Sequence, residues 1–182
     1  MYAGHFASAL AIKAARPKAP TWALLVGVGL LDILFGPFVL LGLERVRMTP
    51  GQGIGFSLTH IDWSHSLAMA LVWSALFALP FLKRGRDVAL TCGFAVFSHY
   101  LLDLTVHPPD LALWPGSRIH LGLGLWETPY WWWFELAFVL ACGAYYWRRA
   151  RVDGRFGGRA PWAIGVIVLL HVANSPWMKM AK

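Results

Sequence analysis

Apolar stretches long enough to cross a lipid bilayer recur along almost the whole chain. A membrane-spanning helix needs about 20 mostly apolar residues. Five stretches approach or exceed that length, and they cover residues 20–43, 65–82, 88–107, 126–147 and 161–178. Little of the 182-residue chain remains between them for a soluble domain. We therefore expect one all-α domain over residues 1–182, a polytopic bundle of transmembrane helices.

The composition agrees with a membrane protein. The chain is 58% hydrophobic and only 14% charged, whereas a soluble domain has about half apolar and a quarter charged residues. A sixth apolar segment, residues 2–16, is short, and we expect it to be an embedded N-terminal helix. It lacks the basic start of a cleaved signal sequence, so we expect it to be retained.

The basic residues alternate between the two sides of the predicted bundle. Eleven would lie on one side: Lys13, Arg16, Lys18, Lys83, Arg84, Arg86, Arg148, Arg149, Arg151, Arg155 and Arg159. Five would lie on the other: Arg45, Arg47, Arg118, Lys179 and Lys182. By the positive-inside rule the first side is cytoplasmic and the C-terminus lies outside. The net charge of +7 therefore reflects membrane topology, and we expect no nucleic-acid partner.

Ionisable residues within the predicted spans gather at one depth. They are Asp32, His99, Asp103, Glu135 and His171, with His60, Asp62, His65, His107 and Glu127 near outer span ends. All lie at mid-membrane or in the outer half. His5 joins them if segment 2–16 has its N-terminus outside, which favours six helices with both termini outside. Buried ionisable groups usually face a bundle interior or cavity, so we expect a polar cluster that opens outward.

The segment FSHYLLDLTVHPPD, residues 97–110, places His99, Asp103 and His107 at four-residue spacing. In a helix this spacing puts all three on one stripe. His99 and Asp103 can ligate one metal ion, or the carboxylate can orient the imidazole. His107 and Asp110 lie where the span leaves the membrane, and this position explains them without a function.

Two further segments supply candidate ligands. HIDWSHS, residues 60–66, offers His60 and His65 as ligand donors, although Asp62 and Ser64 can also cap the helix that follows. Asp32 lies deep in an apolar span, where a carboxylate needs a His, a metal or an Arg as partner, or stays protonated.

Glu135 has a depth similar to that of Asp103. It is a candidate ligand or general base, or it forms a hydrogen bond with a neighbouring helix. Among the remaining polar residues, we expect Glu44 to face lipid headgroups together with Arg45 and Arg47. We expect His171 to be a hydrogen-bonded core residue and His120 to lie in a loop. GQGIG, residues 51–55, lacks the context of a phosphate-binding loop.

Several of these motifs resemble segments of a known group of proteins. SHSLAMA (64–70), SHYLLDLTVHPPDLALWPG (98–116) and the opening GHFASALAIKAA resemble a group of small bacterial inner-membrane proteins. That group is distantly similar to the predicted membrane-bound metal-dependent hydrolases, including the LexA-regulated type. The resemblance covers residues 4 to about 135 and implies a metal site drawn from His5, Asp32, His65, His99 and Asp103. The acidic Pro-Asp-x-Asp-His motif of the hydrolases is reduced here to Asp32, and one His of their second motif is missing.

Our leading hypothesis is a metal-dependent hydrolase that uses Zn²⁺ or a similar divalent ion on a lipid-borne or membrane-accessible ester. His65, His99 and Asp103 would hold the metal, with His5 and Asp32 as ligands or as partners of ligands. Glu135 or Asp62 would act as the catalytic base. The alternative is a non-enzymatic membrane protein, a small transporter or accessory subunit, with the same residues forming a proton or metal-ion path. A purely structural core of hydrogen-bonded His and Asp is a third possibility.

Overall fold

Most of the chain is helical in the structure, a computed structural model that describes residues 1–48, 56–154 and 158–175. The α-helices are α1 (Tyr2–Ala15), α2 (Thr21–Leu40), α3 (Asp62–His65), α4 (Leu67–Ala78), α5 (Arg86–Val106), α6 (Trp131–Asp153) and α7 (Arg159–Ala173). Two 3-10 helices follow α4 and precede α6, namely η1 (Leu79–Arg84) and η2 (Leu125–Glu127). Segments 49–55, with its GQGIG motif, and 176–182 lie outside the described residues.

Two small antiparallel hairpins depart from the all-α expectation. One pairs β1 (Arg45–Met48) with β2 (Phe56–His60), and the other pairs β3 (Leu111–Ala112) with β4 (His120–Leu121). His120 therefore lies in a strand, although we expected a loop. The sequence RVRM alternates polar and apolar residues with the period of a strand, but four residues are too few for that pattern to stand out.

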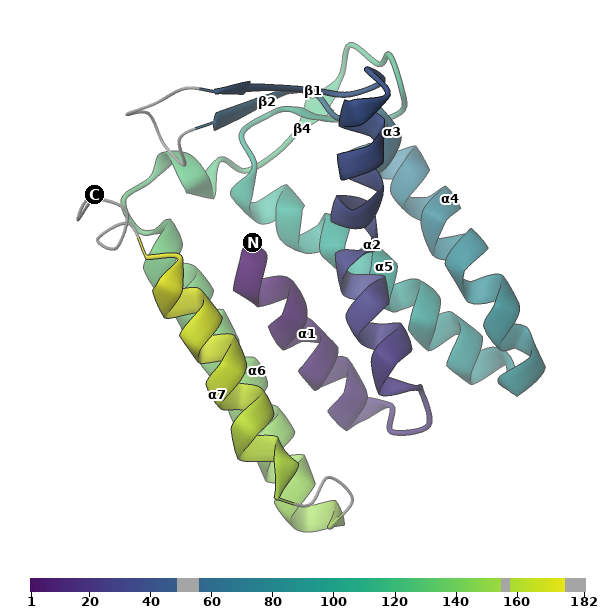
Figure 1. Cartoon of the computed structure of the whole chain (residues 1–182), viewed down its shortest axis with the longest axis vertical. Helices are drawn as coiled ribbons and strands as arrows, with labels where there is room; N and C mark the ends of the chain where they lie inside the picture. The colour runs from purple at the N-terminus through teal and green to yellow at the C-terminus, as the bar shows by residue number, and fades with distance from the viewer. Residues whose placement is uncertain (49–55, 155–157, 176–182) are drawn as a thin grey trace.

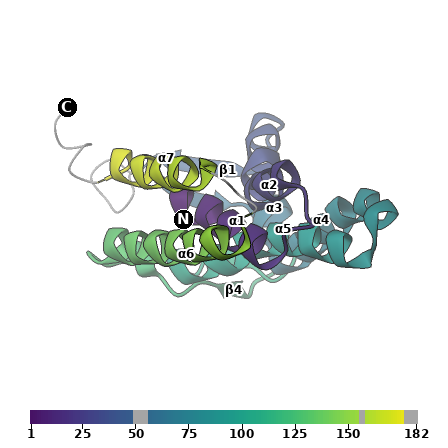
Figure 2. The same cartoon turned by 90° about the horizontal axis from the view of Figure 1, so that it is seen from below.

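The first helix lies at the centre of the bundle. It packs against α6 and α7 on one side and against α2 and α5 on the other (Figure 1). The view from below shows α6 and α7 as a pair, with α4 and α5 at the opposite end of the molecule (Figure 2). Because α1 contacts both groups of helices, residues near its N-terminus can meet side chains from distant parts of the chain.

Three helices in the described part of the chain are long and apolar enough to cross a membrane. They are Thr21–Leu40, the continuous segment Leu67–Arg84, and Arg86–Val106. The described residues therefore do not support the expectation of five such spans. Arg148, Arg149 and Arg151 lie within the last turns of α6 and reduce its apolar length. The described α7 has 15 residues, about 22 Å of helix, which is less than the hydrocarbon core of about 30 Å.

Small residues bring the helices around α5 close together. A Cβ atom at Gly93 would lie only 3.0 Å from the backbone oxygen of Ser74 on α4. A Cβ atom at Gly27 of α2 would lie 3.1 Å from that of Ala95. Glycine at such crossings permits the close backbone approach that is common between membrane helices. The result is tight packing of α2 and α4 on α5, the helix that carries His99 and Asp103.

Candidate metal centre

The structure brings all five predicted metal ligands into one cluster. They come from four elements: His5 from α1, Asp32 from α2, His65 from α3, and His99 with Asp103 from α5. They form two groups whose ligand atoms lie within 4.8 Å of one another, one of His5, His99 and Asp103 and the other of Asp32, His65 and His99. His99 belongs to both groups, so buried His and Asp side chains at this point could hold a metal ion.

Two of the histidines each lie close to both aspartates. Nε2 of His65 lies 3.5 Å from Asp32 Oδ1 and 3.6 Å from Asp103 Oδ2. Nε2 of His99 lies 3.7 Å from Asp32 Oδ1 and 2.9 Å from Asp103 Oδ2. A tetrahedral ion with ligands at about 2.0–2.2 Å holds its ligand atoms about 3.3–3.6 Å apart. These four histidine–aspartate separations bracket that range, so each histidine lies at a distance from each aspartate that suits shared coordination of an ion.

The far nitrogen of each of these two histidines has its own partner. Nδ1 of His99 lies 2.7 Å from the backbone oxygen of Val28, and Nδ1 of His65 lies 2.6 Å from Oγ of Ser64. Metal-binding histidines usually use one nitrogen for the metal and the other for such an orienting hydrogen bond. In both residues the nitrogen left over, Nε2, is the one that faces the cluster.

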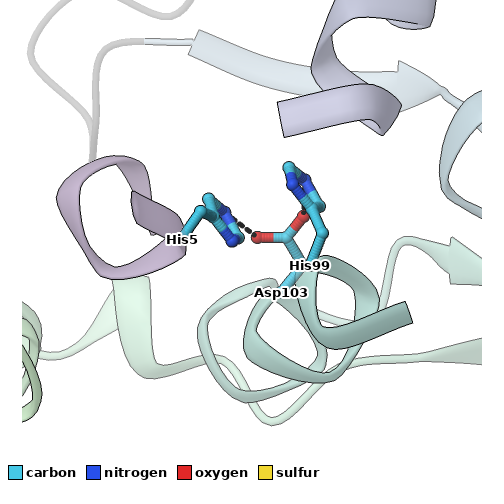
Figure 3. A group of neighbouring side chains, drawn as sticks. All are labelled: His5, His99 and Asp103. Atoms are coloured by element: carbon cyan, nitrogen blue, oxygen red, sulfur yellow. Dashed lines mark ion pairs between the residues drawn. The ribbon is translucent and has the colours of Figure 1, made fainter. Parts of the chain in front are cut away.

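His5 contacts the other oxygen of the Asp103 carboxylate. Figure 3 shows His5 and His99 on either side of the Asp103 carboxylate. Nε2 of His5 lies 3.1 Å from Asp103 Oδ1, and its ring stacks on that of His99 with centroids 3.7 Å apart. The Met1 amino nitrogen lies 3.2 Å from the same carboxylate oxygen. Asp103 is therefore shared, with one oxygen facing His5 and the other facing His65 and His99.

A cavity of about 190 Å³ adjoins the cluster. Its lining residues are Met1, Tyr2, His5, Asp32, Phe35, His65, Asp103, His107 and Trp126. The side chain of Asp32 is 56% exposed, whereas those of His65 and Asp103 are 4% and 3% exposed. Asp32 therefore lies at the mouth of the cavity, with the buried ligand-type side chains behind it. Phe35 and Trp126 give the cavity apolar walls.

His107 belongs to this cavity and not simply to the end of a span. It is 2% exposed, and its Nε2 lies 3.9 Å from Asp103 Oδ1. Its Nδ1 lies 2.9 Å from Asp110 Oδ1, and its ring lies against Trp126 with centroids 4.4 Å apart. The four-residue spacing from Asp103 was the signal for this placement. The chain leaves helical geometry at His107, but the side chain still faces inward.

The two predicted catalytic bases are not among the residues that line the cavity. Oε1 of Glu135 accepts a hydrogen bond of 2.8 Å from the backbone N–H of Gly4, and Oε2 lies 3.8 Å from Nδ1 of His171. Glu135 thus joins α6 to the first turn of α1, which fits the interhelical hydrogen bond considered as an alternative. His171 is buried and stacks on Trp132, consistent with a core residue.

Asp62 also holds a segment of backbone in place. Its Oδ2 accepts a hydrogen bond of 2.8 Å from the N–H of Gly116, in the loop between β3 and β4. Its Oδ1 lies 3.5 Å from Nδ1 of His60, whose side chain is 42% exposed. His60 is thereby directed toward Asp62.

Glu44 is the main polar residue whose environment the sequence did not indicate. We expected it to face lipid headgroups, but it is 1% exposed, so that expectation is wrong. Its carboxylate binds Ser64, the neighbour of His65. Contact between the end of α2 and α3 depends on the tertiary fold and leaves no local pattern in the sequence.

Comparisons of the chain with protein-family models, with curated proteins and with solved structures find no match. The resemblance to the membrane-bound metal-dependent hydrolases stays a prediction.

Proposed function

We propose that the chain is a membrane-embedded, metal-dependent hydrolase that acts on a lipid-borne or membrane-accessible ester. The observation that carries the proposal is that His65 and His99 each lie close to both Asp32 and Asp103, beside a partly apolar cavity. An ionisable group buried at membrane depth is energetically costly unless it has a partner or a function. When bound, a divalent ion such as Zn²⁺ supplies Lewis-acid activation of an ester and of water at neutral pH.

The residues in and around the cluster would have different roles in this function. His65 and His99 offer neutral nitrogen ligands, while Asp103 and Asp32 offer the carboxylates that balance the ion's charge. Exposure of Asp32 at the mouth leaves one side of the cluster open to a substrate. Phe35 and Trp126 provide apolar surface for the non-reacting part of an ester. Glu135 and Asp62 we assign to positioning α1 and the β3–β4 loop.

Membrane embedding is part of the proposal. Among the residues that the structure describes, three helices are long and apolar enough to span a bilayer. In Figure 1 the α1–α2 connection, η1 and the C-terminal end of α6 all lie at the lower end of the molecule. These segments include most of the eleven basic residues, so we place this end in the cytoplasm of a bacterial inner membrane. The metal cluster then faces the outer half of the bilayer.

The alternative, a transporter, is less well supported. Cavities at the basic end are lined by residues such as Arg16 and Asp87, while the metal cluster lies beyond Ala95 on α5. Between these positions Leu24, Val28 and Ala95 are completely buried in an apolar cluster. A transport path needs access from both sides, and this apolar layer separates them.

The test is metal analysis coupled to activity on the purified full chain in detergent, prepared without chelators. We expect about one divalent ion per chain and hydrolysis of chromogenic carboxylic or phosphoric esters in mixed micelles. Chelation should abolish hydrolysis, and added Zn²⁺ should restore it. His99→Ala should lose both properties, whereas the exposed His120→Ala should keep both. A wild-type protein without bound metal would exclude this function, and metal binding without hydrolysis of any ester would favour the non-enzymatic alternative.

A further inference from the structure

A buried chain of hydrogen bonds runs from Glu44 through Ser64 to His65. Oε1 of Glu44 accepts a hydrogen bond of 2.7 Å from the backbone N–H of Ser64. The Ser64 hydroxyl lies 2.8 Å from each oxygen of the same carboxylate and 2.6 Å from Nδ1 of His65. All three residues are at most 3% exposed. A carboxylate with no direct place in the metal cluster is thus connected to one of its histidines.

The chemistry of the three groups sets the direction of these hydrogen bonds. A carboxylate only accepts, and a serine hydroxyl has one hydrogen to donate. If that hydrogen goes to Glu44, the serine oxygen is left as an acceptor for Nδ1–H of His65. The backbone oxygen of Ile61 is a poorer acceptor for the serine, because it lies 3.4 Å away.

We propose that Glu44 and Ser64 are positioning residues that hold His65 with its proton on Nδ1, so that the lone pair of Nε2 faces Asp32 and Asp103. The part of this proposal that concerns metal affinity rests on the proposed function. The part that concerns the proton position on His65 does not.

His99 supports the same arrangement independently. Its Nδ1 lies 2.7 Å from the backbone oxygen of Val28, which can only accept, so Nδ1 carries the hydrogen. Two histidines from different elements are therefore held in the same tautomer by unrelated partners. Both present Nε2 to the same point between Asp32 and Asp103. If Glu44 and Ser64 had only a structural role, His65 would not need to have the same tautomer as His99.

The connection also joins separate elements. Glu44 follows the end of α2, whereas Ser64 lies in the short helix α3. Oγ and N–H of Ser64 both bind Glu44, so α3 is held to the end of α2 by two groups of one residue. Asp32 lies on α2 and His65 on α3, so this link also fixes the two ligand-bearing elements relative to each other.

The test is ¹⁵N NMR of histidine-labelled, metal-free protein in detergent, followed by titration with Zn²⁺. In the wild type, we expect the ¹⁵N shifts of His65 to report a protonated Nδ1 and an unprotonated Nε2. Ser64→Ala keeps the backbone N–H donor to Glu44 but removes the link to His65. We expect it to fold, to give a mixture of His65 tautomers and to bind Zn²⁺ about 10–100-fold more weakly.

Glu44→Gln tests the direction of the hydrogen bonds that run from Glu44 through Ser64 to His65. The amide of Gln donates to Ser64 Oγ, which permits the serine to donate to Nδ1 of His65 and moves the proton to Nε2. We expect this shift toward the Nε2–H tautomer and a similar loss of Zn²⁺ affinity. Asp87→Asn removes one exposed carboxylate at the opposite end of α5 and should change neither measurement.

The outcomes separate the two proposals. An Nε2–H tautomer in the wild type, or no tautomer change in both Ser64→Ala and Glu44→Gln, would overturn the positioning role. An Nδ1–H tautomer that responds to both variants, in a protein that binds no Zn²⁺, would support the positioning role and exclude the metal-dependent function.

Discussion

Nε2 of His99 lies 2.9 Å from Oδ2 of Asp103, one helical turn away on α5, yet it forms no hydrogen bond of standard geometry there. A buried polar atom without a hydrogen bond costs about 1–3 kcal/mol. The two atoms lie side by side and face the same point as Asp32 and His65. A cation at that point would satisfy both atoms.

Removing either member of this pair should abolish metal binding. We expect His99→Ala and Asp103→Ala each to lower Zn²⁺ affinity by more than about 100-fold, since loss of an orienting partner alone costs about 10–100-fold. Isothermal titration of the detergent-solubilised protein measures this directly. His120→Ala, with an exposed side chain, is the matched control. Wild-type affinity in both cluster variants would place the metal elsewhere.

The two aspartates should differ in their effect on stability. Asp103 is buried and contacts His5 and the Met1 amino group, whereas the side chain of Asp32 is 56% exposed. Asp103→Asn should therefore lower the melting temperature of the metal-free protein, because the buried Met1 amino group and the His5 ring lose the carboxylate that they contact. Asp32→Asn should leave it nearly unchanged while weakening Zn²⁺ binding. Equal melting temperatures for both variants in thermal unfolding experiments would contradict this assignment.

Variants of Glu135 can distinguish a catalytic role from a positioning role. Glu135→Ala leaves the buried N–H of Gly4 without an acceptor and should destabilise the protein by about 1–3 kcal/mol. Glu135→Gln retains an acceptor and should keep most of the stability and activity. Chemical unfolding and ester hydrolysis should be measured on both variants. Full stability with complete loss of hydrolysis in Glu135→Gln would instead support the predicted role as base.

The glycine at the crossing of α4 and α5 should be intolerant of a methyl group. Gly93→Ala places a Cβ atom 3.0 Å from the backbone oxygen of Ser74 and should destabilise the bundle by about 1–3 kcal/mol. Gly29→Ala, on α2, meets only Ile33 at 3.9 Å and should be neutral or slightly stabilising. Thermal unfolding of the two variants in the same detergent compares them, and equal stability would show that the crossing can relax.

The sequence predicted much of the cluster, because regular helices carry its strongest signals. The four-residue spacing of His99 and Asp103, and the depth of Asp32 within an apolar span, follow directly from helical periodicity and the cost of charge in a bilayer. Glu44 was misplaced because its partner, Ser64, is brought to it by the tertiary fold. Local patterns do not report such contacts.

The number of spans was overestimated for a different reason. Hydropathy in α6 and α7 is high at the centre of each helix, but arginines or the helix ends cut the apolar length short. The two hairpins were not predicted because their strands are short. Each hairpin lies in a segment that we interpreted as a connection between membrane spans. Helix existence was therefore easier to predict than helix length or the structure between helices.

The cluster draws on α1, α2, α3 and α5, so no contiguous part of the chain contains it. A ribosome must complete α5 before the His5–Asp103 contact can form, because Asp103 lies 98 residues after His5. Under the proposed function, metal loading would be a late event in biogenesis, and a bound ion would cross-link helices that are made early and late. Free metal concentration would consequently set the apparent folding equilibrium of the whole bundle through mass action.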